Sequence, residues 1–463
     1  MKKIAKSAPA ARFSPRACLA AIGAKLRALD LLAPVREKLR IHQKTVQHAP
    51  LEKIEDALIT ILAGAHGLSE INTRLRSDPA LQRAFGRKGC ADQSVVQATL
   101  NACTSTNVAQ MMQALDAIFR QRSLALRHDF TSGLLILDAD ITGLPCGKKA
   151  EGSVKGYFST AGIRYGRQMG RVLAAQYEEV VIDRLYPGNL QLTRTLRPMI
   201  LDAEQTLSLD AASRKRTLIR VDAGGGSLDE VNWVLGRGYQ IHCKDYSGAR
   251  AEALAGAVKT WVNDLKHPGR QLGWVEVDSP EYVRPVRRLA IRFPKKRGVL
   301  QHALLISTLE PKEVISLLGL PIHLLHDPQA VILAYATLYD QRGGTVEIEI
   351  KESKQGIGIN RRSKKRFAAQ QMVMLLGSLA HNLIVWSRRW LTAEAPRLAA
   401  YGALRMVRDL FHVAGLLEFD PQGQLTRITL NRAAPLVREL ATALPQVVGA
   451  DKDQHRGRRH LAA

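Results

Sequence analysis

The 463-residue sequence lacks any arrangement of cysteines that would suggest a disulfide framework or a zinc site. Its five cysteines are scattered, none forms a Cys-x-x-Cys pair, and their number is odd. Small disulfide-stapled folds and zinc knuckles both need regularly spaced cysteines, so neither class fits. The sequence therefore predicts a protein that keeps its thiols reduced in the cytoplasm.

Long apolar runs are missing as well. The apolar run Ala17–Ala24 is short, follows Arg12 and Arg16, and is closed by Lys25. A membrane-spanning helix needs about 20 predominantly apolar residues, and a secretory signal needs an apolar core and a cleavage site. We therefore expect no membrane span and no export.

Acidic residues are scarce relative to basic ones. Lysine and arginine number 67 against 42 aspartates and glutamates, which gives a net charge of +25 and an isoelectric point near 10.1. Such a surface attracts polyanions, and nucleic acid is the first partner to consider, although ribosomal proteins, nucleases and membrane-surface proteins share this balance. With 46% hydrophobic residues, the chain is too apolar for general disorder and long enough for two or three domains.

The first 125 residues are predicted to be helical and basic. Residues 1–50 are rich in alanine and basic side chains and interrupted by proline, which is typical of a loosely ordered arm or of short helices. Residues 51–125 carry apolar side chains at helical spacing, with basic residues between the helices at Arg74, Arg76, Arg83, Arg87 and Lys88. A helix-turn-helix DNA-binding domain would have this pattern, and so would any small helical domain with basic turns.

The pattern changes to alternating strands and helices over residues 126–245. Residues 134–141 and 217–222 form two apolar runs of the kind found in buried central strands. A helix is predicted over 191–207, a second one begins after the capping residue Ser227, and residues 239–244 follow as a strand. Alternation of this kind predicts an α/β core.

The remainder of the chain divides into three segments. Residues 246–328 show a period of two, which predicts a β-rich insertion. Residues 329–395 return to a helical pattern and include the long apolar-faced run Phe367–Leu391. Residues 396–463 form a C-terminal region with a hairpin over 416–430 and a basic tail.

Two aspartates stand at the ends of the predicted central strands. Asp140 closes the first apolar run and Asp222 closes the second, just before three glycines. An open α/β sheet forms a crevice at its strand ends, and carboxylates that meet there can hold hard divalent cations. Taken alone, an aspartate after a strand is more often a turn or helix-cap residue.

The segment from Tyr339 to Lys354 provides a third acid. Tyr339 and Arg342 are separated by two residues, and Glu347 and Lys354 by six. On a helix, Glu347 shares a face with Lys351 and Lys354, at steps of four and seven residues. An exposed helix with ion pairs would explain the charges but not the two upstream strand-end aspartates.

These spacings resemble those of bacterial insertion-sequence transposases of the Asp-Asp-Glu type, whose third acid lies in a Tyr, Arg, Glu, Lys signature. The sequence has four residues between Arg342 and Glu347 instead of the usual three, so the extra glycine should bulge before the helix and Glu349 is the alternative acid. Asp140 followed by Thr142 resembles the first motif, with Asp138 as its alternative. Arg220-x-Asp222 resembles the second motif.

The resemblance implies an α/β fold: a ribonuclease-H-like catalytic core interrupted by a β-rich insertion, with an α-helical N-terminal DNA-binding domain and a mostly helical C-terminal region. It implies that Asp140, Asp222 and Glu347 are catalytic and hold two Mg²⁺ or Mn²⁺ ions. The resemblance also implies a set of DNA contacts, namely Tyr339, Arg342, Lys351 and Lys354.

The activity implied is cut-and-paste transposition in the bacterial cytoplasm, in association with the nucleoid. The partners would be double-stranded DNA, both as transposon terminal inverted repeats and as target, with the enzyme a dimer in the DNA complex. In related enzymes an aromatic side chain of the insertion stacks on a flipped base, and Trp274 or Trp261 could serve, although core packing is the commoner role of a tryptophan. A catalytically silent DNA-binding protein or repressor derived from a transposase is the alternative, followed by another two-metal nuclease.

Overall fold

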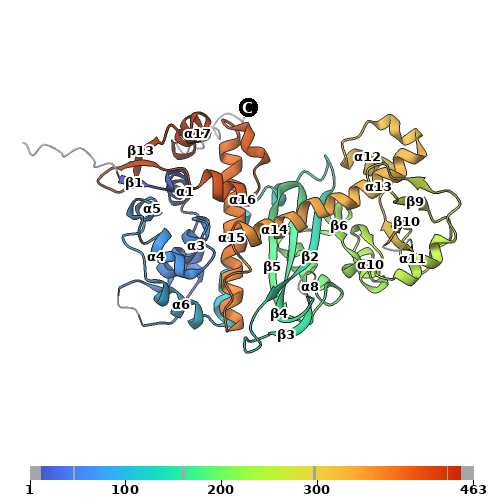
Figure 1. The fold of residues 1–463 in the computed structure, drawn as a ribbon, viewed down its shortest axis with the longest axis horizontal. Coiled ribbons are helices and arrows are strands. Elements are labelled where there is room, and N and C mark those ends of the chain that lie inside the picture. Colours follow the sequence, from blue (N-terminus) through green and yellow to red (C-terminus); the bar gives the residue numbers. More distant parts are fainter. Residues whose placement is uncertain (1–11, 45–46, 159–161, 296–298, 435, 450–463) are drawn as a thin grey trace, which may run out of the picture. The chain divides into compact units, whose positions relative to one another are not determined.

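The computed structural model describes residues 12–44, 47–158, 162–295, 299–434 and 436–449. The chain divides into two compact units (Figure 1). Residues 1–122, 149–151 and 351–463 form the first, here called the terminal unit, and residues 123–148 and 152–350 form the second, here called the sheet unit. This division is coarser than the six segments expected from the sequence, and those finer boundaries stay predictions.

The terminal unit is built around one long apolar helix, α15 (Phe367–Thr392). By length and composition α15 could cross a membrane, but 89% of its most apolar window is buried inside the protein, as in a core helix. The described helices that complete the unit are α1 (Ala17–Ala28), α2 (Ala33–Lys38), α3 (Pro50–Leu62), α4 (Ile71–Arg74), α5 (Pro79–Ala84), α6 (Gln93–Ala102), α7 (Ser105–Arg122), α16 (Ala403–Arg405) and α17 (Val437–Gly449).

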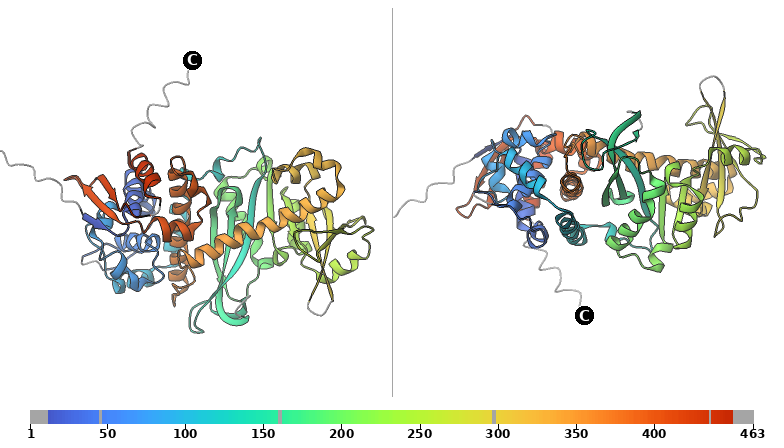
Figure 2. Two further views of the ribbon diagram at one scale, coloured as in Figure 1. Left: turned by 45° about the horizontal axis from the view of Figure 1, so that its top comes forward. Right: turned by 90° about the horizontal axis from the view of Figure 1, so that it is seen from below.

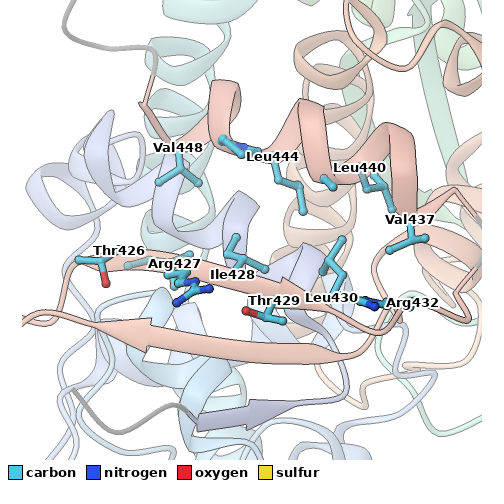
Figure 3. Close-up of a pocket in the computed structure, with 13 residues that line it drawn as sticks. Thr426, Arg427, Ile428, Thr429, Leu430, Arg432, Val437, Leu440, Leu444 and Val448 are labelled. Carbon is cyan, nitrogen blue, oxygen red and sulfur yellow. The ribbon is translucent and has the colours of Figure 1, made fainter. Parts of the chain in front are cut away.

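A small sheet joins an N-terminal segment to a C-terminal hairpin within the terminal unit. Strand β1 (Arg12–Ser14) pairs antiparallel with β12 (Gly415–Phe419), which pairs in turn with β13 (Leu425–Leu430). Side chains of β13 and α17, among them Ile428, Leu430, Leu440 and Leu444, line a pocket of about 690 Å³ (Figure 3). The hairpin expected over residues 416–430 is therefore present, and it packs with the N-terminal segment.

The sheet unit contains a ten-stranded mixed sheet in the order β3-β4-β2-β6-β7-β11-β10-β9-β8, with β5 beside β4. Its central strands β2, β6 and β7 are parallel and the other pairs are antiparallel. The strands are β2 (Leu135–Pro145), β3 (Val154–Phe158), β4 (Gly162–Ala174), β5 (Glu179–Pro187), β6 (Thr217–Val221), β7 (Gln240–Lys244), β8 (Val262–Asn263), β9 (Gln271–Trp274), β10 (Arg287–Pro294) and β11 (Leu300–Ser307).

Helices cover both faces of this sheet. Helices α8 (Leu192–Leu207) and α10 (Leu228–Gly236) lie on one face, and α13 (Pro328–Arg342) crosses the other (Figure 2). The remaining helices of the unit are α9 (Ala211–Lys215), α11 (Gly248–Ala255) and α12 (Pro311–Leu317). Ser227 caps α10 as expected, because its hydroxyl accepts a hydrogen bond from the Glu230 amide. A parallel centre covered on both faces explains the nearly continuous apolar sequence of β2 and β6.

The segment expected as a β-rich insertion continues the same sheet. Strand β11 pairs antiparallel with β7, and β10, β9 and β8 extend the sheet from there. Leu272, Leu289 and Leu305 of these strands belong to the same buried cluster as Tyr335 and Leu338 of α13. The insertion therefore helps to form the hydrophobic base on which α13 rests.

A buried ion pair ties α13 to the two central strands. Arg220 of β6 donates to both carboxylate oxygens of Asp138 on β2, from Nε at 2.6 Å and from Nη2 at 2.8 Å. Its Nη1 donates to the carbonyl of Leu338 at 3.0 Å, and the hydroxyl of Thr345 donates to Asp138. Asp138 is fully buried and Arg220 is 2% exposed, so this cluster, here called the Arg220 cluster, joins three chain segments inside the protein.

Loss of one partner of the Arg220 cluster should be more harmful than loss of both. Arg220→Met leaves the Asp138 carboxylate buried without a counter-charge, and we expect it to lower the free energy of unfolding by about 3–5 kcal/mol. The double variant Arg220→Met/Asp138→Leu should recover much of that loss. Chemical denaturation of wild type, both single variants and the double variant measures the coupling; additive losses would contradict it.

Candidate active site

The first two acids of the motifs lie side by side on the face of the sheet that α13 crosses. Strands β2 and β6 are parallel, and their pairing runs from Leu135 opposite Thr217 to Asp138 opposite Arg220. Asp140 and Asp222 lie two residues further along each chain, and alternation along a strand places Asp140 on the face of Asp138. Strand β2 continues to Pro145, so Asp140 stands within a strand instead of at its end, whereas Asp222 directly follows β6.

The third acid is carried by a helix with a π-helical turn. Helix α13 passes into a π-helical segment, Gly343–Glu347, which passes into α14 (Ile348–Gln355). A π turn accommodates one more residue than an α turn without ending the helix. The extra residue before Glu347 is therefore absorbed inside a continuous helix, and the bulge expected before the helix is not present.

Glu347, and not Glu349, shares the guanidinium of Arg342 with Asp140. The carboxylate of Glu347 accepts a hydrogen bond from Arg342 Nη2 at 2.7 Å and its side chain is 55% exposed. Arg342 in turn places Nη1 3.6 Å from Asp140. Glu349 is 8% exposed and is buried in the protein. The geometry thus favours the expected acid over its alternative.

Asp138 and Asp140 have different environments. Both carboxylate oxygens of Asp138 accept hydrogen bonds from Arg220. The side chain of Asp140 is 14% exposed and accepts one backbone hydrogen bond, from the amide of Ile141. Burial raises the pKa of Asp140 to about 6; Arg342 opposes the shift, and the nearby carboxylate of Asp222 adds to it. Asp140 can therefore still accept a ligand, whereas Asp138 has a structural role in linking β2 to β6.

Asp222 contributes an unsatisfied oxygen to the site. Its Oδ1 atom is buried and has no hydrogen-bond partner among the described residues. A buried carboxylate oxygen without a donor is costly, and such atoms commonly mark the place of a ligand. Asp222 therefore has the valence that a bound cation would satisfy.

Arg342 is the counter-charge of the three carboxylates. Its side chain is 4% exposed, it bonds Glu347, and its Nε atom is buried without a hydrogen-bond partner in the described part of the chain. Burial alone would lower the pKa of Arg342, but Asp140 and the other acidic groups raise it above the usual value. Three carboxylates around one guanidinium leave an excess of negative charge.

Tyr339, one helical turn before Arg342, is half-buried beside two residues that the motifs do not include. The ring of His242 lies 6.2 Å from its ring, and Lys244 Nζ lies 5.7 Å from its centroid. Burial raises the pKa of Tyr339 to about 12, and burial lowers the pKa of Lys244, which the charges of Asp340 and Asp222 raise in part. The tyrosine therefore keeps its hydroxyl proton at neutral pH.

Lys244 and Thr345 were not identified from the sequence. Lys244 ends β7, the strand beside β6, so its position at the end of a predicted parallel strand was the available signal. Thr345 bonds Asp138 across the core, and no local pattern reveals such a contact.

Lys351 and Lys354 follow Glu347 on α14, beyond the boundary between the two units. Their proposed contact with DNA stays a prediction. The two tryptophans of the insertion are engaged in packing: Trp274 contacts Tyr335 edge to face at 5.1 Å, and Arg292 covers the ring of Trp261 at 4.1 Å. Base stacking by either one also stays a prediction.

The donor set fits hard divalent cations in its chemistry. Carboxylates are the ligands that Mg²⁺ and Mn²⁺ prefer, and Asp222 offers an oxygen without a partner. Within the described residues, no three His, Cys, Asp or Glu side chains are grouped closely enough to enclose a metal ion. Arg342 lies between Asp140 and Glu347, so the acids are arranged around a guanidinium.

The raised pKa of Asp140 predicts a pH-dependent cost to stability. A carboxyl group whose pKa rises from 3.8 to about 6 on folding binds its proton more tightly in the folded state, so its ionisation destabilises the fold. Asp140→Asn should raise the free energy of unfolding by up to about 3 kcal/mol above pH 6, less between pH 4 and 6, and not at all below. Denaturation at a series of pH values measures this; a gain that is independent of pH would contradict it.

Comparison with known proteins places the chain in a family. No curated protein matches it. Among solved structures, the piggyBac transposase in its synaptic complex with hairpin DNA is 13% identical, with a TM-score of 0.45 over 87% of this chain and 82% of that chain, a likeness too low to carry functional detail. The family model described as "Transposase DDE domain group 1" matches residues 17–449. Because that match spans most of the sequence, the chain belongs to the DDE transposase family, group 1.

Proposed function

We propose that this protein is a DNA transposase that cuts at the ends of a transposon and joins the freed ends to target DNA. The observation that carries the proposal is the convergence of Asp140, Asp222 and Glu347 on Arg342, with one oxygen of Asp222 left without a partner. Membership of the family gives this group of acids its chemical meaning. The mixed sheet crossed by α13 is consistent with a ribonuclease-H-like core.

In this proposal Asp140, Asp222 and Glu347 hold two Mg²⁺ or Mn²⁺ ions. When bound, such ions activate the attacking oxygen of a phosphodiester reaction and stabilise the leaving oxygen. Asp140 must lose its proton to act as a ligand, and because burial raises its pKa to about 6, only about half of the Asp140 side chains are ionised at pH 6. The Arg220 cluster holds β2, β6 and the π-helical turn in register, so it positions all three acids.

Arg342 is the best placed of the proposed DNA contacts. Its guanidinium has an Nε without a hydrogen-bond partner in the described residues, and arginine suits bidentate contact with a phosphate. Tyr339 lies on the same helix one turn earlier, and Lys351 and Lys354 follow on α14. We assign these four residues to the grip on the terminal phosphates, in a dimer that holds two inverted repeats in the bacterial cytoplasm.

Cleavage of the transposon end provides the direct test. With Mg²⁺ or Mn²⁺, the wild-type protein should nick a labelled duplex that carries the flanking terminal repeat. Glu347→Gln should lower the rate by at least about a thousandfold, because a metal ligand would be lost. Glu349→Gln is the matched control, since it makes the same change two residues away on the same helix.

The same assay separates the two candidate functions. Equal loss of cleavage in both variants would show that Glu347 has no special role. Specific binding of the repeat without nicking by the wild type would instead favour the catalytically silent DNA-binding protein or repressor.

Metal binding can be tested without cleavage. Mn²⁺ at 100 times its dissociation constant should raise the free energy of unfolding by about 2.7 kcal/mol in the wild type. The increase should be absent in Asp222→Asn and should shrink below about pH 6, where Asp140 takes up a proton. Thermal melting with and without Mn²⁺ measures it; equal shifts in wild type and Asp222→Asn would place the ion elsewhere.

A further inference from the structure

The terminal unit contains a second charged site, which is a groove lined by basic side chains. Its volume is about 390 Å³, and it lies between the end of α1, helix α5 with the loop that follows it, and the turn that joins β12 to β13. Five of its lining residues are basic, and none is acidic: Arg12, Arg27, Arg83, Arg87 and Lys88. We call it the Arg27–Arg83 groove.

Two of these cations are oriented by backbone carbonyls. Arg27 Nη1 donates to the carbonyl of Gly423 at 2.8 Å, and Arg83 Nη2 donates to the carbonyl of Asp420 at 3.1 Å. The guanidinium of Arg83 also lies 5.1 Å from the centroid of the Phe419 ring. A carbonyl fixes the direction of a guanidinium without neutralising its charge, so both positive charges remain available.

The turn is shaped to receive these two side chains. Gly423 has a φ of +80°, a conformation that a residue with a side chain rarely adopts. A Cβ atom there would lie 3.5 Å from Arg83 Nε and 3.9 Å from Arg27 Nη1. The carboxylate of Asp420 is used within the turn, where it accepts the amide hydrogen of Gln424 at 2.7 Å.

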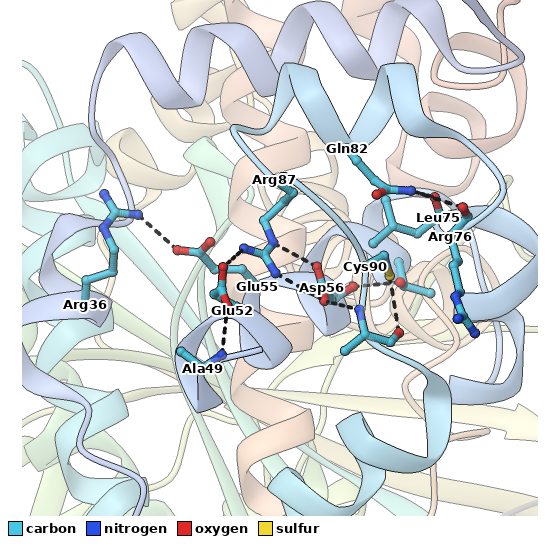
Figure 4. A network of polar contacts seen from close by, with 12 residues as sticks. Arg36, Ala49, Glu52, Glu55, Asp56, Leu75, Arg76, Gln82, Arg87 and Cys90 are labelled. Carbon is cyan, nitrogen blue, oxygen red and sulfur yellow. Dashed lines mark hydrogen bonds and ion pairs between the residues drawn. The ribbon is translucent and has the colours of Figure 1, made fainter. Parts of the chain in front are cut away.

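Arg87 differs from its neighbours in the groove. Its guanidinium bonds Asp56 at 2.9 Å and Glu52 at 2.6 Å, and its side chain is 5% exposed (Figure 4). The sequence placed Arg87 among the basic turn residues, but its charge is compensated inside the protein. In the part of the chain that the structure describes, Arg12, Arg27, Arg83 and Lys88 have no carboxylate at ion-pair distance.

We propose that the Arg27–Arg83 groove binds the phosphate backbone of duplex DNA, and that the β12–β13 turn is part of the DNA-binding surface of the terminal unit. Four uncompensated cations around one groove match a ligand with repeated negative charges, as a phosphodiester chain has. The inference rests on the proposed function, which supplies DNA as the substrate. It adds a contact made jointly by the N-terminal helices and the C-terminal hairpin.

The test is equilibrium binding of the full chain to a labelled duplex without divalent metal, at salt concentrations from about 50 to 200 mM. The variants Arg27→Gln/Arg83→Gln and Arg12→Gln/Lys88→Gln each remove two charges. Each should weaken binding about 10- to 100-fold and reduce the slope of log affinity against log salt by about 2. The control Lys38→Gln/Lys44→Gln removes two exposed charges elsewhere in the same unit and should change the slope little.

Each other outcome is decisive. Should Arg27→Gln/Arg83→Gln fail to fold, Arg12→Gln/Lys88→Gln decides alone, because Arg12 and Lys88 are exposed. An unchanged slope of log affinity against log salt in a folded groove variant would overturn the proposal. A loss of DNA affinity no larger than that of the control, or tighter binding of an RNA competitor of the same length, would overturn it as well. A wild type that binds DNA with the expected groove dependence but never nicks it would refute the proposed function and leave the groove standing.

Discussion

The buried pair between Arg220 and Asp138 is the interaction on which the arrangement of the site depends. It joins β2 to β6, and through the carbonyl of Leu338 and the hydroxyl of Thr345 it fixes the end of α13 and the π-helical turn. Asp140, Asp222 and Glu347 each lie two residues from a member of this cluster. Without it, three acids from distant parts of the chain would have no common frame.

Arg342 places a positive charge between the carboxylates of the site itself. Burial is the main cause of the raised pKa of Asp140, and the nearby carboxylates of Asp222 and Glu347 add to it. The guanidinium between Asp140 and Glu347 reduces the repulsion between these carboxylates while the acids keep oxygens for ligands. The two arginines thus have different roles: Arg220 is saturated and structural, whereas Arg342 retains an unused donor.

The terminal unit shows the same distinction between compensated and available charge. The charge of Arg87 is neutralised by Asp56 and Glu52. Arg27 and Arg83 donate to backbone carbonyls, which leave their charge uncompensated. A net charge of +25 therefore says little about where a polyanion binds until the partners of each cation are known. Pairing of β1 with β12 brings an N-terminal segment beside the C-terminal hairpin, which allows the β12–β13 turn to complete a surface formed by the N-terminal helices.

The sequence by itself determined the elements that local patterns control: the apolar strand that contains Asp140, the apolar strand that Asp222 directly follows, the capped helix after Ser227, and the helical segment that contains Glu347. Periodicity, capping and motif spacing are properties of neighbouring residues, so they can be read in one dimension. Tertiary structure alone decided that Asp138 pairs with Arg220 and that the β-rich segment extends the central sheet. It also decided that a π-helical turn accommodates the extra residue and that the charge of Arg87 is neutralised by Asp56. Each of these depends on contacts between residues far apart in the chain, whose free energy no local pattern encodes.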